Sequence, residues 1–208
     1  MGERFEVMNK DWYGFYKNID IENEIAHQAV VHDDLIKGVT SLSANSVLEV
    51  GSGSASISFS IAKAKKGLGI TTVDNRPEIL SKIIKDANKL GLNIKTICAD
   101  AFKLPFSDNA YDVVFSQGVL EHFKDSDIKK LVDEKLRVCS KSVFISVPNN
   151  YYNCRDFGDE RLLSKQQWDK ILSGFNIAES GTYYYIRAKR NFFRRLPVMY
   201  MCRIDKEK

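Results

Sequence analysis

Residues 46–55 read SVLEVGSGSA and decide the fold. A short aliphatic run carries Glu49 near its end and then breaks into a turn that contains Gly51 and Gly53. Residues 54–66 follow this turn and are expected to form a helix. Glycine allows a sharp turn and lets a ligand lie against bare main chain, while the first turn of a helix offers unpaired N–H groups. The stretch therefore predicts a strand, a glycine turn and a helix start that together bind a nucleotide-like ligand.

Short apolar runs alternate with helical stretches beyond residue 45. The expected strands cover residues 46–50, 68–73, 94–98, 111–116 and 142–147, and the expected helices cover residues 54–66, 77–90 and 125–139. Strands that alternate with helices indicate parallel βαβ units. The predicted fold class is therefore α/β, with a doubly wound and mostly parallel sheet.

The C-terminal part of the chain has a different pattern. Residues 164–173 predict a short helix with Ser164 as its N-cap. Residues 176–186 and 197–204 then read as two strands without a helix between them. Such a pair predicts an antiparallel hairpin at the edge of the sheet, which brings the sheet to seven strands.

Length and composition fit one domain. The chain has 208 residues, of which 44% are hydrophobic and 28% are charged, as is typical of globular proteins. The four cysteines form no CxxC pair, which argues against a zinc site and fits a reducing cytoplasm. No window is long and apolar enough to cross a bilayer. We expect a single domain over residues 1–208, with a helical N-terminal lid (1–40), a cofactor-binding core (45–147) and a substrate-side loop with the C-terminal strands (148–208).

Three acids stand at the ends of three successive expected strands. Glu49 is the next-to-last residue of the first, Asp74 follows the second and Asp100 follows the third. Ligands of doubly wound folds bind at the carboxyl ends of the strands, and an acid about 20 residues beyond the glycine turn commonly binds ribose hydroxyls. Each acid alone also suits a turn or a helix cap. Their shared placement favours one ligand site.

The residues of the glycine turn distinguish between cofactors. A dinucleotide fingerprint carries a third glycine, whereas residues 51–56 read GSGSAS. Glu49 stands just before the turn, where a carboxylate repels a diphosphate and attracts a cation. S-adenosylmethionine (SAM) carries an ammonium and a sulfonium and has no phosphate. The charge therefore favours SAM over NAD.

Four blocks of the sequence resemble class I SAM-dependent methyltransferases. They are the glycine stretch, Asp74, Asp100 with Ala101, and residues 117–122, which read QGVLEH. The resemblance covers roughly residues 45–180 and is closest to the ubiquinone- and menaquinone-type small-molecule branch. It implies a Rossmann-like methyltransferase fold that transfers a methyl group from SAM to a small-molecule acceptor and leaves S-adenosylhomocysteine (SAH). The chain departs from the family at Ala55, where a third glycine is usual.

The resemblance also implies a role for each matching residue. Asp74 would bind the ribose diol, Asp100 and the Ala101 N–H would hold the adenine, and Gln117 and Gly118 would line the methionine end. The full predicted cofactor set is Glu49, Gly51, Ser52, Gly53, Asp74, Asn75, Asp100, Ala101, Gln117 and Gly118.

His122 is the candidate catalytic base, because histidine titrates near neutral pH. The alternative is that Glu121 and His122 only shape a helix start or contact SAM. Some ubiquinone-type O-methyltransferases hold a divalent metal with E-x-x-E-H. Gly118 stands here at the first acid position, so no metal site is expected. His27 and His32 fall on an expected N-terminal helix and are interpreted as structural or exposed.

The substrate side is predicted at the N-terminal lid and the loop after the fifth strand. The resemblance places the acceptor there, and mixed aromatic and polar groups suit a ring-bearing or polar small molecule. Aromatic side chains near a terminus also commonly anchor it to the core. The predicted residues are Trp12, Tyr13, Tyr16, Asn149, Tyr151, Tyr152 and Arg155.

Three other functions remain open at this stage. The basic stretch from Arg187 to Arg195 interleaves cations with two phenylalanines and could attract RNA or an acidic protein surface, although such a stretch is also typical of a solvated loop. A non-catalytic SAM-binding module and an NAD enzyme are the other two. The sequence does not choose between O-, N-, S- and C-methylation, since the fold serves them all.

Overall fold

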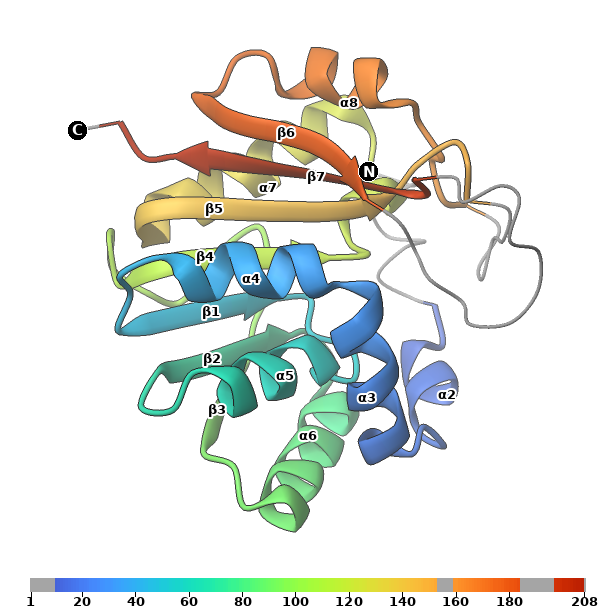
Figure 1. Cartoon of the computed structure of the whole chain (residues 1–208), viewed down its shortest axis with the longest axis vertical. Coiled ribbons are helices and arrows are strands. Elements are labelled where there is room, and N and C mark those ends of the chain that lie inside the picture. Colours follow the sequence, from blue (N-terminus) through green and yellow to red (C-terminus); the bar gives the residue numbers. More distant parts are fainter. Residues whose placement is uncertain (1–9, 153–158, 184–196, 208) are drawn as a thin grey trace.

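A seven-stranded sheet forms the centre of the computed structural model, which describes residues 10–152, 159–183 and 197–207 (Figure 1). The strand order is β3-β2-β1-β4-β5-β7-β6. Strands β1 to β5 pair in parallel, and β7 pairs antiparallel with both β5 and β6. The strands are β1 (Ser46–Val50), β2 (Gly69–Asp74), β3 (Ile94–Cys98), β4 (Tyr111–Gln117), β5 (Cys139–Pro148), β6 (Ile177–Tyr183) and β7 (Met199–Asp205). The predicted α/β fold with a mostly parallel sheet is confirmed.

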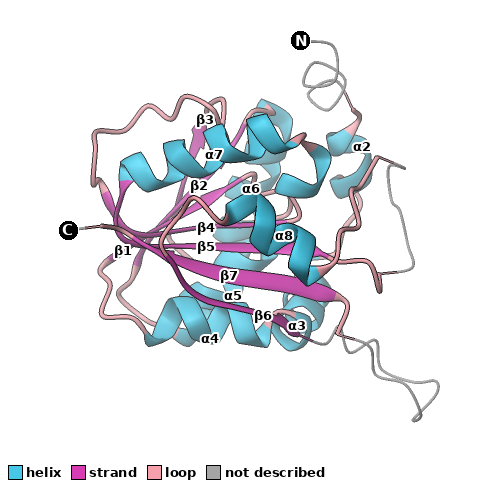
Figure 2. Cartoon of the chain, turned by 90° about the horizontal axis from the view of Figure 1, so that it is seen from above, coloured by secondary structure: helices cyan, strands magenta, loops and turns pink. Residues whose placement is uncertain are grey.

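Helices cover both faces of the sheet, with α4 and α5 on one face and α7 and α8 on the other (Figure 2). Two buried apolar clusters fill the spaces between sheet and helices. Among the described residues, no helix is both long and apolar enough to cross a bilayer. The helices are α2 (Trp12–Tyr16), α3 (Ile21–Val31), α4 (Asp33–Ser41), α5 (Ser56–Ala64), α6 (Pro77–Leu90), the 3-10 helix η1 (Leu120–His122), α7 (Asp125–Val138) and α8 (Lys165–Leu172).

The predicted C-terminal hairpin is present, but the order of its two strands in the sheet was not predicted from the sequence. The later strand, β7, lies between β5 and β6, so β6 forms the edge. Helix α8 begins where predicted, since the Ser164 side chain and the Gln167 side chain cap each other's main chain. Residues 184–186, which were expected to extend β6, lie outside the described part of the chain.

The predicted N-terminal lid divides into two parts. Apolar residues of α3 and α4, such as Ile25 and Val39, are buried in the same cluster as α5 and the sheet. These helices are therefore a layer of the core, because their apolar stripes need a partner. Only the short helix α2 lies beyond the carboxyl ends of the strands (Figure 1), where it contacts α6.

A buried hydrogen-bonded chain joins the α3–α4 junction to the sheet. Tyr183 Oη lies 2.5 Å from His32 Nδ1 and 2.5 Å from Ser146 Oγ, and all three residues are buried. Burial, with a smaller effect from His27, lowers the pKa of His32 to about 3. The imidazole is therefore neutral and can accept or donate in this chain. This fits the expected structural role of His32.

We expect the Tyr183→Phe substitution to lower the free energy of unfolding by about 1–3 kcal/mol. The change leaves the His32 and Ser146 polar atoms buried without this partner, and an unsatisfied buried group costs about that much. Urea unfolding followed by circular dichroism measures the effect. Tyr13→Phe is the control, because Tyr13 is 40% exposed. Equal changes in the two variants would contradict the prediction.

Candidate cofactor-binding site

The turn after β1 has a backbone that requires glycine at two places. Gly51 and Gly53 have φ values of +76° and +50°, in the left-handed region that other residues rarely adopt. The N–H groups of Gly51 and Ser52 donate to the Val73 carbonyl at the end of β2, at 2.8 and 3.1 Å. A Cβ at Gly51 would lie 2.6 Å from Val119 Cγ2. The turn is thus fastened to β2 and packed against the segment after β4.

Ala55 ends the turn and occupies the position where the family usually has a third glycine. Its φ is +55°, and its side chain is fully buried at the N-cap of α5. The backbone here has the conformation that glycine favours, and alanine adopts it at a cost of about 1–2 kcal/mol. Helix α5 therefore begins at Ser56, two residues later than predicted.

A pocket of about 110 Å³ opens at the carboxyl ends of β1, β2, β3 and β4. Seven of the ten predicted cofactor residues line it, whereas Glu49, Ser52 and Gln117 do not. Trp12 and Tyr16 from α2, together with His122 from η1, form other parts of the wall. The seven are Gly51, Gly53, Asp74, Asn75, Asp100, Ala101 and Gly118.

Asp74 is held in place at the end of β2 by the main chain. Its Oδ2 accepts from the Gly53 N–H at 3.2 Å, and its Oδ1 accepts from the Arg76 N–H at 3.1 Å. Burial raises the pKa of this carboxyl, while these N–H donors oppose the shift. Asp74 thus connects the glycine turn to β2 and presents its carboxylate to the pocket.

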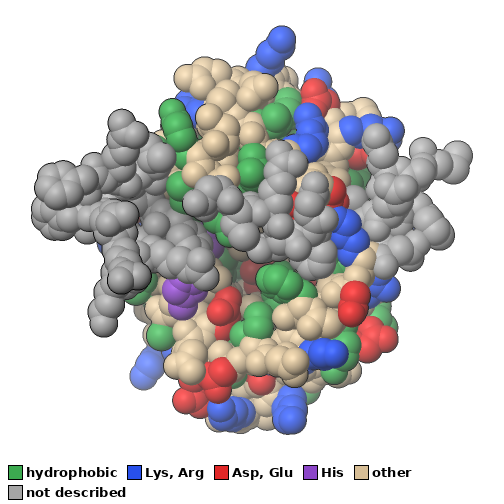
Figure 3. Space-filling model, turned by 90° about the vertical axis from the view of Figure 1, so that its right-hand side faces the viewer, with side chains coloured by type: hydrophobic (Ala, Val, Ile, Leu, Met, Phe, Trp, Pro, Cys, Tyr) green, Lys and Arg blue, Asp and Glu red, His purple; other side chains and the backbone are tan. Residues whose placement is uncertain are grey.

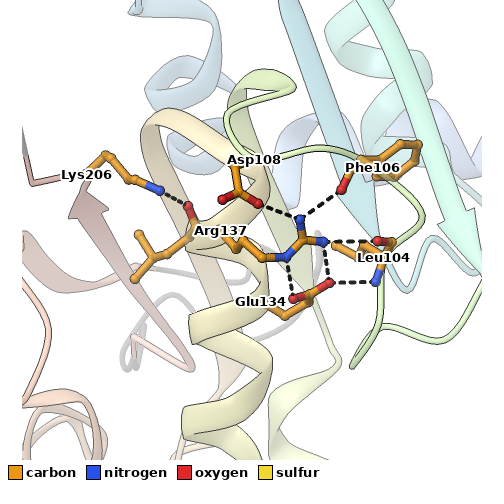
Figure 4. Close-up of polar contacts among 7 residues, drawn as sticks. Leu104, Phe106, Asp108, Glu134, Arg137 and Lys206 are labelled. Carbon is orange, nitrogen blue, oxygen red and sulfur yellow. Dashed lines mark hydrogen bonds and ion pairs between the residues drawn. The ribbon is translucent and has the colours of Figure 1, made fainter.

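Arg137 fastens the loop that follows Asp100 and Ala101. Its guanidinium donates to the carbonyls of Leu104 and Phe106 and to the carboxylates of Asp108 and Glu134 (Figure 4). Glu134 in turn accepts from the Leu104 N–H at 2.6 Å. Helix α7 therefore fixes the loop between β3 and β4. No sequence motif pointed to Arg137.

Buried carboxylates surround the methionine end predicted for the site. Burial raises the pKa of Glu49 to about 8, although its Oε2 accepts from Ser58 Oγ at 2.6 Å. Burial likewise raises the pKa of Glu121 to about 8. Burial, followed by the charges of Asp74, Glu121 and Glu49, raises the pKa of the Tyr16 phenol. A cation beside these acids would lower their pKa and ionise them, so this buried region suits a positively charged ligand.

Tyr16 lies directly over the glycine turn. A Cβ at Gly53 would lie 2.6 Å from Tyr16 Cζ and 2.7 Å from its Oη. The bare main chain of Gly53 is therefore what allows the phenol to approach. The short helix α2 in this way forms a wall of the pocket.

His122 lies between α2 and the segment before α8. Its Nδ1 is 3.1 Å from Asp159 Oδ1, and its ring meets the Trp12 ring edge to face at 5.1 Å between centroids. Burial lowers the pKa of His122, and the adjacent Asp159 opposes the shift. At neutral pH the imidazole is therefore uncharged. With Nδ1–H donating to Asp159, the lone pair lies on Nε2.

Asp159 and Glu160 complete a cluster that the sequence did not reveal. Ligand atoms of His122, Asp159 and Glu160 lie within 4.8 Å of one another. Lys10 forms an ion pair with Asp159 in the same place, so a metal ion there would compete with the lysine. The sequence offered no signal for this cluster, because 37 residues separate His122 from Asp159.

The predicted substrate-side residues fall in different surroundings. Asn149 is buried, donates from Nδ2 to the Pro197 carbonyl at 2.6 Å and accepts at Oδ1 from the Tyr151 N–H at 2.9 Å. It therefore holds the loop, and its predicted place beside the substrate finds no support. Tyr13 and Tyr151 are exposed, and Tyr152 is half-buried. Arg155 lies outside the described residues.

The stretch from Arg187 to Arg195 also lies outside the described residues. The face that carries the strand ends shows hydrophobic, acidic and basic side chains interspersed in its described part, with no continuous basic patch there (Figure 3). This visible surface does not resemble one that binds phosphate backbones, which carries clustered Lys and Arg.

Comparison with known proteins identifies the family. Residues 47–142 match the family described as "Methyltransferase domain". The ubiquinone/menaquinone biosynthesis C-methyltransferase UbiE of Rickettsia prowazekii is 35% identical over 154 residues, which cover 71% of this chain and 58% of the relative. A probable (S)-tetrahydroprotoberberine N-methyltransferase of Papaver bracteatum is 34% identical over 116 residues, which cover 54% of this chain and 31% of the relative. The chain thus spans less than two thirds of the length of these curated relatives.

The fold matches solved methyltransferases. The magnesium protoporphyrin IX methyltransferase of Synechocystis, solved with bound SAM, superposes with a TM-score of 0.60 at 17% identity, covering 88% of this chain and 83% of that one. The residues present fit SAM, since seven of the ten predicted cofactor residues, Asp74 and Asp100 among them, line one pocket at the strand ends. Residues 47–142 of this chain therefore form a class I, SAM-dependent methyltransferase domain.

Proposed function

We propose that this chain transfers the methyl group of SAM to a small-molecule acceptor. The observation that carries the proposal is the glycine turn tied to Asp74 at the carboxyl ends of β1 and β2. The buried acids Glu49 and Glu121 can ionise when a cation binds beside them, which favours a cationic ligand over a diphosphate. An NAD enzyme would place a diphosphate next to those acids, so this alternative is disfavoured.

The residues of the pocket would hold SAM at three points. Asp74 would accept from the ribose hydroxyls, Asp100 and Ala101 would contact the adenine, and the main chain of Gly51 and Gly53 would lie against the methionine part. SAM supplies a methyl group that its sulfonium makes electrophilic. The protein mainly holds the reactants in line, which can contribute about 7–11 kcal/mol to lowering the barrier.

Aromatic side chains favour a ring-bearing acceptor. Trp12, Phe102 and Phe123 line the pocket, and the two phenylalanine rings pack edge to face at 5.4 Å. These rings exclude water and offer flat apolar surfaces. The names of the matched relatives, a quinone-biosynthesis C-methyltransferase and a tetrahydroprotoberberine N-methyltransferase, agree with such an acceptor.

We propose that His122 acts as the general base when the acceptor must lose a proton. Because burial lowers its pKa, kcat/KM should be constant near neutral pH and fall tenfold per pH unit below a pKa under 6.5. The His122→Gln substitution should remove this acid limb and lower kcat by about 10²–10⁴-fold. His27→Gln, on α3, is the control. An acid limb that persists in His122→Gln would assign the titration to another group.

Turnover of SAM to SAH with a panel of ring-bearing acceptors tests the function. We expect acceptor-dependent SAH release, and mass spectrometry of the product would give the methylated atom. An RNA arm at low salt tests the second candidate, since binding through phosphates falls steeply with log[salt]. SAM binding without turnover on any acceptor would favour a non-catalytic SAM-binding module, and failure to bind SAM would refute the cofactor assignment.

A further inference from the structure

Glu121 is a buried acid directly behind the wall of the pocket. It lies on η1, its side chain is 3% exposed, and its Oε1 is 3.6 Å from the point where a Cβ at Gly118 would stand. Gly118 itself lines the pocket. Within the described part of the chain, Glu121 Oε2 is buried and has no hydrogen-bond partner. A buried carboxylate oxygen without a partner is costly and calls for a function.

Within the described residues, no ion pair joins Glu121 to a cation. Asp159 and Glu160, before α8, add negative charge near Glu121, while burial lowers the pKa of Lys135 on α7 to about 7. Lys135 is fully buried and directs its Nζ to Ser116 Oγ at 2.8 Å. Its influence on the Glu121 pKa is the smallest of those named. Lys135 therefore does not neutralise Glu121 from the side that faces the pocket.

Two more acids and one phenol lie at this end of the sheet. Asp74 and Tyr16 line the pocket, whereas Glu49 does not. The charges of Asp74, Glu121 and Glu49 all raise the pKa of the Tyr16 phenol, after the larger effect of burial. Asp74 accepts from two main-chain N–H groups and Glu49 accepts from Ser58, whereas Glu121 Oε2 accepts from none of the described groups.

We propose that Glu121 is a charge-selecting residue, which makes the site bind the cationic donor SAM more tightly than its neutral thioether product SAH. The inference rests on the proposed function and deepens it. SAM and SAH differ by one methyl group and one positive charge, so a carboxyl group that ionises beside the sulfonium attracts SAM more strongly than SAH. Two opposite charges a few ångströms apart at a protein's effective dielectric interact strongly enough for about a tenfold preference or more. Selection of this kind would favour release of the product.

The protonation of Glu121 gives a second signature of the same role. Burial, followed by the charges of Glu160 and Asp159, raises its pKa to about 8, so the group is largely protonated at neutral pH. A cation beside it lowers this pKa. SAM binding at pH 7 should therefore release a proton, and SAH binding should release much less. Glu49 shares a pKa of about 8, so part of the release should persist without Glu121.

Isothermal titration calorimetry with SAM and with SAH tests the proposal. Titrations at pH 7 in two buffers of different ionisation enthalpy give the affinity and the number of protons released. The variant is Glu121→Gln, which keeps the shape of the side chain and removes its charge. Glu121→Asp keeps the charge, and Glu22→Gln is a control at a side chain that is 60% exposed.

We expect Glu121→Gln to weaken SAM binding about tenfold, to leave SAH binding within about threefold and to reduce the SAM-linked proton release. Glu121→Asp should retain most of the preference for SAM. Equal weakening of both ligands, or an unchanged SAM-to-SAH ratio in Glu121→Gln, would overturn the charge-selecting role and leave the proposed function standing. A wild-type chain that binds neither ligand would overturn the proposed function and the charge selection with it.

Discussion

Replacing Asp74 with alanine is expected to abolish most of the thermal protection that SAM and SAH give to the protein. The carboxylate would accept from the ribose hydroxyls, and a hydrogen bond to a charged group contributes about 1.5–3 kcal/mol. A loss of about 3 kcal/mol weakens binding roughly 100-fold. The same substitution removes the acceptor of the Gly53 and Arg76 N–H groups, so the glycine turn loosens too. Thermal melting with and without each ligand measures the effect.

Two further variants separate binding from folding. Asp33→Ala removes an acid that is 50% exposed and pairs with Lys37 one helical turn away, so ligand protection should stay as in the wild type. Asp74→Asn keeps one of the two acceptor oxygens, so without ligand it should melt above Asp74→Ala, while losing most of the protection. Full protection of Asp74→Ala by SAM would contradict the assignment.

The Gly51→Ala substitution is expected to lower the free energy of unfolding by about 2–5 kcal/mol. Alanine at a left-handed φ costs about 1–2 kcal/mol, and its Cβ would lie 2.6 Å from Val119 Cγ2, where overpacking adds about 1–3 kcal/mol. Displacement of Val119 would also disturb the pocket, because Val119 lines it. Urea unfolding and SAH titration measure the two effects.

Gly67 offers a matched control for the clash. Its φ is +84°, and a Cβ there would meet nothing within 4 Å. Gly67→Ala should therefore carry only the backbone penalty of about 1–2 kcal/mol and leave SAH affinity unchanged. Equal destabilisation by the two alanines would show that the contact with Val119 does not matter.

Much of the cofactor side was predictable from the sequence, because parallel strands bring their carboxyl ends to one edge. Asp74 and Asp100 follow β2 and β3, and a glycine turn follows β1, so topology alone places them together. The secondary structure was predictable for a different reason: buried strands and amphipathic helices differ in the period of their apolar residues. The bounds of β1, β3 and α6 agree with the prediction.

Other features depend on contacts between distant segments, which no local pattern encodes. Asp159 reaches His122 across 37 residues, and Arg137 reaches three residues of the β3–β4 loop, Leu104, Phe106 and Asp108. The burial of Glu121 and the structural role of Asn149 follow from how loops pack on the sheet. Residue types alone suggested a helix start or a SAM contact for Glu121 and a substrate contact for Asn149.

The position of β7 has a consequence for how the chain folds as it is made. β6 precedes β7 in the sequence, yet among the described strands it pairs with β7 alone. During synthesis β6 therefore emerges with no strand to pair with, and β5 keeps one open edge until residues 199–205 follow. Open edges are templates for association between chains, and partly made domains expose them. For this protein the interval between translation of β6 and β7 is the period of greatest vulnerability to misassembly.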